Sequence, residues 1–234
     1  MNWRMGFAAT AVVALLCAVV AWRSSQRVFT VGFVFDDFPF VVSEGATAAL
    51  GGAFTASETQ AIKRTSRDEL TRAFSGLNLT ITDSPSAFWT IRVRQSFEPR
   101  RWQRLPIAGE TFVMGPLGGR STVNFSEVLM AAIAHAPPDV TRQLFVDGIG
   151  RGIGRTAAHE LAHAILGVSG PMDNRTDARS YEYYTHNRPE HYYGALHWSQ
   201  AWPVLVDRVG AAARDGYSFA STERTNVSGA VTGP

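Results

Sequence analysis

Residues 156–170 of the chain read TAAHELAHAILGVSG. Within them, residues 159–163 form the pattern H-E-x-x-H, with His159 and His163 four positions apart. Side chains at that spacing lie on one face of an α-helix, so the two imidazoles can direct their nitrogens at a single ion. The stretch therefore predicts a helix that carries two ligands of a metal site.

Glu160 follows the first histidine directly and projects beside the pair on such a helix. In that place a carboxylate can polarise a metal-bound water and act as a general base, as it does in zinc hydrolases that carry this pattern. The alternative interpretation is a buried helix with two incidental histidines. The surroundings of the motif decide between the two.

Composition narrows the class of protein. The 234 residues are enough for one domain with appendages, and 45% hydrophobic with 18% charged residues are typical of a globular chain with a sizeable core. The formal net charge of +2 is too small to indicate a nucleic-acid partner.

The only cysteine is Cys17. The part of the chain that follows it therefore has no disulfide and no thiolate ligand. A metal site must then be built from His, Asp, Glu and water, which suits a catalytic Zn²⁺ better than a structural one.

Residues 5–22 form an apolar run of eighteen residues followed by Arg23. This is typical of a signal peptide or a single N-terminal membrane anchor, and 19–21 (VVA) is a possible cleavage site. We expect residues 1–26 to be this leader. The protein would then be secreted or periplasmic, or anchored through residues 5–22 with its catalytic domain outside the cytoplasm.

Between the leader and the motif, the sequence predicts both strands and helices. Alternation and β-branched content indicate strands at 28–34, 77–82, 87–97, 111–114 and 121–125. A capping-box start at 57–60 predicts an amphipathic helix that ends near Gly76, and further helices are expected at 126–135 and 139–145.

Three other stretches are expected to be irregular. Residues 45–52, rich in glycine and alanine, indicate a loop, and 98–119 indicate a long loop that could border a substrate cleft. The alternating glycines of 147–154 predict either a hinge or close packing before the motif helix.

A catalytic zinc needs a third protein ligand. The acidic residues and histidines after residue 170 that could supply it are Asp173, Asp177, Glu182, His186, His191 and His197. Glu182 is favoured because nineteen residues beyond His163 leave room for a second helix to return with a carboxylate. Asp177 is the nearest rival, and Asp173 and His186 remain open. Glu182 could equally cap a helix or pair with an arginine.

The same region offers a group that could stabilise an oxyanion above the metal. His197 is the first candidate, with Tyr193 and His186 as alternatives, and simple packing is the competing role for each. An amphipathic closing helix is expected at 198–213 and a disordered tail at 217–234, so the folded domain is predicted at 27–216.

Residues 54–170 resemble a metzincin-type zinc metalloprotease. The likeness lies in the capped helix, the LNLTIT strand, further strands with a loop, and the helix ending AAHELAHAILG. It implies an α+β fold in which a mixed β-sheet is backed by two long helices, with zinc in a cleft below the edge strand and a C-terminal helical subdomain. It also implies His159 and His163 as ligands, Glu160 as general base, and a peptide or protein substrate.

The sequence departs from this family after His163. The family pattern continues with a glycine and a third histidine, where this chain has Leu166 and Ser169. A glutamate from a following helix, as in the gluzincins, would suit Glu182. Two functions are therefore carried forward: a zinc-dependent metallopeptidase, or a non-catalytic zinc-binding module of the cell envelope that keeps the fold. The intact Glu160 favours the first.

Overall fold

The computed structural model describes residues 29–36, 38–96, 108–113, 118–167 and 170–212. The predicted leader and the predicted tail at 217–234 lie outside the described residues, as does most of the loop expected at 98–119. None of the helices in the described ranges is both long and apolar enough to span a bilayer.

Five strands form one mixed β-sheet. β1 (Phe29–Phe35), β2 (Leu79–Thr82), β3 (Trp89–Arg94) and β5 (Gly119–Asn124) run parallel, whereas β4 (Gly109–Val113) runs antiparallel to β5. The order across the sheet is β2-β1-β3-β5-β4, so β4 is an edge strand. The predicted mixed sheet is confirmed, and all five predicted strands are present within a few residues of the expected bounds.

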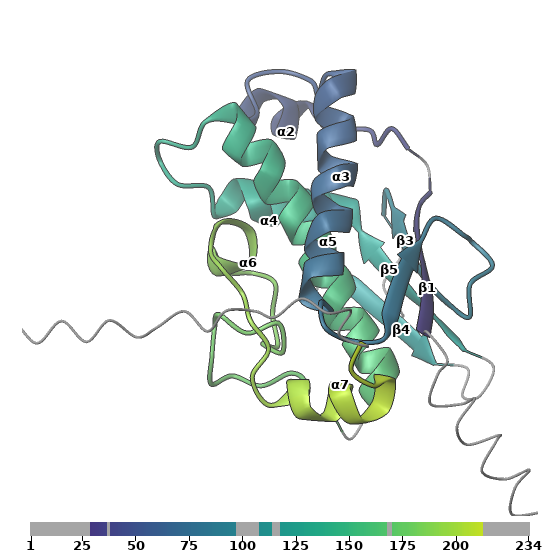
Figure 1. The fold of residues 1–234 in the computed structure, drawn as a ribbon. Helices are drawn as coiled ribbons and strands as arrows, with labels where there is room; N and C mark the ends of the chain where they lie inside the picture. The colour runs from purple at the N-terminus through teal and green to yellow at the C-terminus, as the bar shows by residue number, and fades with distance from the viewer. Residues whose placement is uncertain (1–28, 37, 97–107, 114–117, 168–169, 213–234) are drawn as a thin grey trace, which may run out of the picture.

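The helices gather on one side of the sheet (Figure 1). Alternation along β1 turns Val31 and Phe33 to that side, where both are buried, and Ile91 of β3 lies beside Phe33 in register. Gly32, between them, faces the other side. A Cβ there would collide with the main-chain oxygen of Ser84 in the loop that follows β2. The glycine therefore lets the chain cross β1 on its way from β2 to β3.

Six helices are described: α2 (Glu44–Ala49), α3 (Ala56–Ala73), α4 (Phe125–Ala134), α5 (Arg142–Leu166), α6 (Glu190–Tyr193) and α7 (Ala201–Val209). The two long ones, α3 and α5, pack against each other, and α5 also contacts β3, β4 and β5 (Figure 1). The capping box of α3 is formed by Thr55 and Glu58, two residues before the predicted start. The loop predicted at 45–52 is wrong, because Ser43 caps a short helix there.

The glycine-rich stretch 147–154 lies inside α5, so the predicted hinge is wrong and the predicted close packing is confirmed. A Cβ at Gly150 would lie 2.7 Å from the Cβ of Thr65 on α3, and one at Gly152 would lie 2.5 Å from the Cε1 of Tyr192 on α6. The glycines thus let two neighbours approach the backbone of α5. This packing outweighs their low helix propensity.

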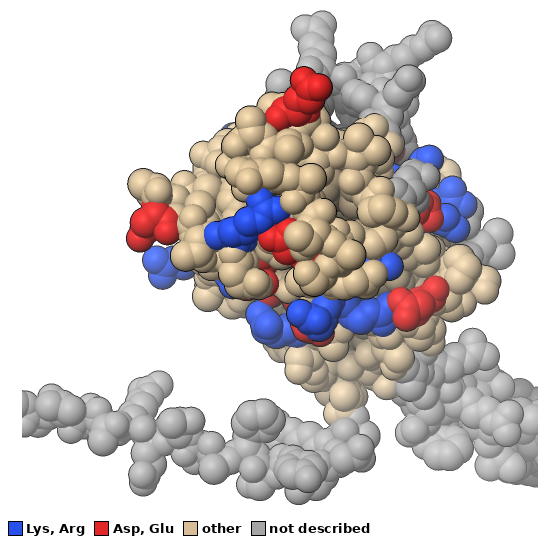
Figure 2. Space-filling view, turned by 90° about the horizontal axis from the view of Figure 1, so that it is seen from above, with Lys and Arg blue, Asp and Glu red and all other residues tan. Residues whose placement is uncertain are grey.

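The N-terminal ends of α3 and α5 are joined by an ion pair between Glu58 and Arg142. The two contacts join Nε to Oε1 at 2.6 Å and a terminal guanidinium nitrogen to Oε2 at 3.0 Å. Figure 2 looks onto this end of the molecule, where basic and acidic side chains lie next to one another on a largely uncharged surface.

The region after α5 contains less helix than predicted. α6 has four residues and α7 has nine, so the closing helix expected at 198–213 is confined to Ala201–Val209. Most of the rest is irregular, with isolated bridges such as Asn174 to Tyr183 and Ser180 to His197. The predicted C-terminal helical subdomain is therefore wrong for most of residues 170–200, which we call the strap. Side-chain hydrogen bonds hold the strap where a helical ladder was expected.

Candidate metal centre

His159 and His163 lie at the C-terminal end of α5 and face each other. Their Nε2 atoms are 3.1 Å apart, and the rings meet edge to face with centroids 4.7 Å apart. The helix ends three residues later at Leu166, where Gly167 adopts φ +70°. The negative end of the helix dipole therefore lies close to the pair, which favours a cation there.

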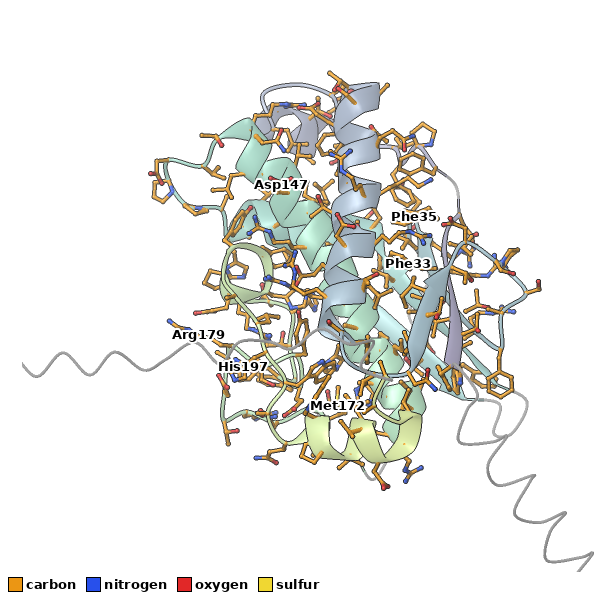
Figure 3. The ribbon with its side chains drawn as sticks, in the orientation of Figure 1. Phe33, Phe35, Asp147, Met172, Arg179 and His197 are labelled. Carbon is orange, nitrogen blue, oxygen red and sulfur yellow. The ribbon has the colours of Figure 1, made fainter. Side chains whose placement is uncertain are left out.

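Asp173 completes a group of three donors. Its Oδ1 lies 3.3 Å from Nε2 of His159 and 3.5 Å from Nε2 of His163. The backbone of Asp173 is in the left-handed region, with φ +58°, a conformation that aspartate tolerates better than most residues. Met172, just before it, packs against the core in the lower part of Figure 3. The turn after α5 thus returns a carboxylate to the two histidines.

The geometry of the three donors fits a small divalent ion. A tetrahedral ion with bonds of about 2.0–2.1 Å needs neighbouring donor atoms about 3.3 Å apart. The three separations here are 3.1, 3.3 and 3.5 Å. Among the described residues, His159, His163 and Asp173 are the one group of three potential ligands that lie this close together. Two imidazoles and a carboxylate suit Zn²⁺ and other divalent transition metals.

Glu160 lies against the edge strand. Its Oε2 is 2.6 Å from Oγ1 of Thr111 on β4, and a Cβ at Gly109 would lie 2.5 Å from its Oε1. Both β4 residues face α5 because they alternate with Glu110 and Phe112 along the strand. Glu160 is 8% exposed, and this burial raises the pKa of its carboxyl group even though the two nearby histidines oppose the shift.

The orientation of His159 is set from the strap. Its Nδ1 lies 2.7 Å from the main-chain oxygen of Tyr181, which can only accept, so Nδ1 carries a proton. When the ring is neutral, Nε2 therefore presents a lone pair to the group. Burial lowers the pKa of His159, but the bond to Asp173, the charge of Glu160 and the Tyr181 carbonyl outweigh it and raise the pKa above its usual value. The hydrogen bonds that Asp173 accepts from His159 and His163 hold the pKa of its carboxyl group well below its usual range.

Glu182, the favoured third ligand in the sequence, lies in a different network. It is fully buried, and its carboxylate accepts five hydrogen bonds of 2.6–3.1 Å. The donors are the Asn174 amide, the Ser199 hydroxyl and three main-chain N–H groups at the start of α7. A buried carboxylate finds many donors at a helix N-terminus, which satisfies it without a metal. The structure brings Asp173, and not Glu182, to the histidines.

His197 and Asp177 pair with each other. Nε2 of His197 lies 3.0 Å from Oδ2 of Asp177, and more than half of the histidine side chain is exposed. Figure 3 shows His197 beside Arg179, whose main-chain oxygen accepts a hydrogen bond from the His197 N–H. Neither His197 nor Asp177 belongs to the three-donor group. The geometry therefore does not assign His197 the predicted oxyanion role.

The remaining candidates also have other surroundings. His191 is buried, with Nε2 3.1 Å from the Thr156 hydroxyl, and its ring centroid is 6.3 Å from that of His186. Burial, followed by the charge of Arg188, lowers the pKa of His186 to about 4. The Tyr193 hydroxyl donates to a main-chain oxygen of α4 at 2.7 Å. None of these side chains belongs to the three-donor group.

No local pattern in the sequence points to Gly109, Thr111 or the carbonyl of Tyr181 as part of the site. Their roles come from pairings across the fold, and local sequence carries no signal for those. Asp173 was one open candidate among several. The turn-forming Gly170-Pro171 just before it is a signal that could have raised its rank, because such a turn can send the chain back toward α5.

Comparison with protein-family models and with curated proteins finds no match for this chain. The interpretation of the site therefore depends on its own geometry. That geometry is three potential metal ligands on and after one helix end, with a sequestered carboxylate on the adjacent helical position.

Proposed function

We propose that this protein is a zinc-dependent peptidase with His159, His163 and Asp173 as metal ligands. The observation that carries the proposal is the three-donor group, with Glu160 at the helical position directly after its first histidine. The choice of zinc and of a peptide substrate comes from the H-E-x-x-H pattern and the donor types.

The chemistry divides between the ion and the chain. Zn²⁺ bound by the three donors would polarise a substrate carbonyl and make water more acidic. Glu160 would take a proton as the water oxygen bonds to the carbonyl carbon. It would give that proton to the amine nitrogen as the C–N bond breaks.

The surrounding architecture supports a zincin-like assignment. The resemblance implies a cleft below an edge strand, and β4 is the antiparallel edge strand whose Gly109 and Thr111 flank Glu160. It also implies two long helices behind the sheet, which α3 and α5 provide. The proposed departure from that family is the aspartate ligand, which follows His163 by ten residues.

The test uses the full-length protein, with metal analysis and hydrolysis of an unfolded protein substrate as separate readouts. We expect one zinc per chain, retained in Glu160→Gln, with hydrolysis in that variant lower by a factor of about 10²–10⁴. Glu44→Gln, at an exposed position of α2, is the matched control and should leave both readouts unchanged. A chain without stoichiometric metal, or full activity in Glu160→Gln, contradicts the proposal.

The alternative function is a non-catalytic zinc-binding module of the cell envelope. One observation favours it: the Glu160 carboxylate is largely covered, and Oε2 already has Thr111 as a hydrogen-bond partner. In that case the wild-type protein would bind zinc but would hydrolyse no member of a broad peptide library. The same two readouts therefore separate the alternatives.

A further inference from the structure

We infer that Glu69 and Tyr181 are positioning residues of the metal centre, which act on His159 through the main-chain carbonyl of Tyr181. This inference rests on the proposed metal centre. It assigns a role to two residues that are not metal ligands, Glu69 on α3 and Tyr181 on the strap.

The last link in this chain is the carbonyl of Tyr181. It lies 2.7 Å from Nδ1 of His159 and accepts the ring N–H. The bond fixes both the tautomer and the rotation of the imidazole, and so the direction of the Nε2 lone pair. Nε2 is the atom that faces His163 and Asp173. A displaced carbonyl would therefore move a metal-binding atom.

Tyr181 is held at its side chain and at its main chain. Its hydroxyl donates to Oε1 of Glu69 at 2.9 Å, and its N–H donates to the oxygen of His197 at 3.0 Å. The ring packs at 4.9 Å from that of Trp198, and the residue is buried. Tyr181 has no helical hydrogen bonds around it, so these two hydrogen bonds and the ring contact determine where its carbonyl lies.

Glu69 connects this tyrosine to the helix that carries the motif. It is 1% exposed, and its Oε1 also accepts from Nε of Arg155 at 2.8 Å, while Oε2 accepts from Arg72 at 2.7 Å. Arg155 lies one turn before His159 on α5 and donates its other N–H groups to main-chain oxygens of residues 190, 191 and 194. The buried carboxylate of Glu69 thus binds two residues that flank His159 in the chain: Arg155 on α5 before it and Tyr181 on the strap after it.

The decisive variant is Tyr181→Phe, which removes the hydroxyl and keeps the ring and the carbonyl. Tyr193→Phe is its matched control, because Tyr193 also donates one hydroxyl hydrogen bond, to Ala132, away from the metal centre. We expect Zn²⁺ affinity, measured by chelator competition on the full-length protein, to fall about tenfold in Tyr181→Phe, at the low end for loss of an outer partner. The affinity of Tyr193→Phe should be unchanged.

Glu69→Gln extends the test to the other end of the chain of contacts. It should weaken zinc binding in the same direction, and the double variant with Tyr181→Phe should be weaker than the more affected single variant by less than twofold. Such non-additivity is expected when two residues act through one path. Circular dichroism of the metal-free variants checks that each is folded. If Glu69→Gln fails to fold, the Tyr181→Phe comparison alone decides.

A second readout needs no metal. Nitrogen-15 spectra of the metal-free protein, recorded at a pH where the His159 ring is neutral, should show that ring as the Nδ1–H tautomer, and a mixture of tautomers in Tyr181→Phe. Equal zinc affinities for Tyr181→Phe and Tyr193→Phe, with an unchanged tautomer, overturn the inference and leave the metal centre intact. Wild-type protein that binds zinc without hydrolysing peptides contradicts the peptidase only. If wild-type protein binds no zinc, the proposed function fails. The tautomer of His159 in wild type and in Tyr181→Phe still tests whether Tyr181 orients that ring.

Discussion

Oγ1 of Thr111 lies 2.6 Å from Oε2 of Glu160, although 49 residues separate the two in the chain. The contact joins the edge strand β4 to the helix that carries the motif, and the hydroxyl also lies 2.8 Å from the main-chain oxygen of Glu160. The orientation of the proposed general base is therefore controlled by a strand and not only by its own helix.

The first prediction concerns this hydroxyl. Thr111→Val keeps the β-branched shape and removes the donor, so we expect kcat/KM for peptide hydrolysis to fall about tenfold or more with zinc content unchanged. A hydrogen bond to a charged group contributes about 1.5–3 kcal/mol, and about 1.4 kcal/mol corresponds to a factor of ten in rate. Thr122→Val makes the same change on the other face of the sheet and should leave activity unaltered. Equal effects of the two variants would show that Thr111 acts only on the stability of the sheet.

The second prediction identifies the third ligand. Asp173→Asn keeps the size of the side chain and its tolerance of φ +58° but removes the charge, so the fold should persist. We expect zinc affinity to fall more than about 100-fold, because a lost ligand should cost more than the 10- to 100-fold of an outer-shell partner. Titration of zinc against a chelator measures this.

Glu182→Gln is the companion variant. The amide NH2 of the glutamine would face groups that now donate to the carboxylate, such as the N–H groups of Ser199 and Ala201, and donors cannot bond to one another. We therefore expect the unfolding free energy to fall by about 1–3 kcal/mol. Zinc affinity of the folded protein should change less than tenfold. The reverse pattern, with metal lost in Glu182→Gln and kept in Asp173→Asn, would restore Glu182 as the ligand.

The third prediction tests how closely β4 approaches Glu160. Gly109→Ala would put a Cβ 2.5 Å from Oε1, so the carboxylate must move. A displacement near 1 Å can cost about 100-fold in rate, and we expect hydrolysis to fall by that order while zinc remains bound. Gly45→Ala on α2 is the control, because a Cβ there would meet no atom within 4 Å, so hydrolysis should be unchanged. Unchanged hydrolysis in Gly109→Ala would mean that the strand yields in place of Glu160.

The fourth prediction concerns acid stability. Hydrogen bonds from Arg142, with the main-chain N–H of Thr55, lower the pKa of Glu58 from 4.5 to about 2. A group whose folded pKa is depressed contributes stability that is present above the unfolded pKa and is lost as pH falls through the folded pKa. Stability should therefore decline between pH 4.5 and about 2 as Glu58 is protonated.

Glu58→Gln tests this pair, because glutamine keeps the capping box and removes the charge. We expect about 1 kcal/mol less stability at pH 7, the scale of a partly exposed ion pair, and a shallower decline between pH 4.5 and 2. Urea unfolding at several pH values measures both. Glu44→Gln should leave the pH profile as in the wild type, and an identical profile for Glu58→Gln would contradict the assignment.

The elements of the fold were largely predictable because their signals are local. Alternation in LTIT and WTIRVR indicates β2 and β3, and the spacing of apolar residues indicates α3. The errors occur where local preference is outweighed. The four glycines within residues 147–154 suggest a break, yet they lie in the middle of α5 because α3 and α6 pack closely against them.

The helical part of the candidate site was predictable for the same reason. His159, Glu160 and His163 fall on one helix, so their spacing alone places them together. The strap obeys no such periodicity. Glu182 and Asp173 are both carboxylates after a turn, and their roles differ because one meets the N–H groups at the start of α7 while the other returns to the histidines.

The sequence by itself determined the strands, the helix α3 and the histidine pair, since these follow from patterns of period two and 3.6 within short windows. The mixed sheet and the two long helices were implied by the resemblance to a known family. Only the tertiary structure decided which carboxylate faces the pair, which strand covers Glu160 and which carbonyl orients His159. The last two of these relationships join residues 49 and 22 positions apart, in contacts of 2.6 and 2.7 Å. Contacts of that kind depend on how packed elements meet, and no local pattern encodes that meeting.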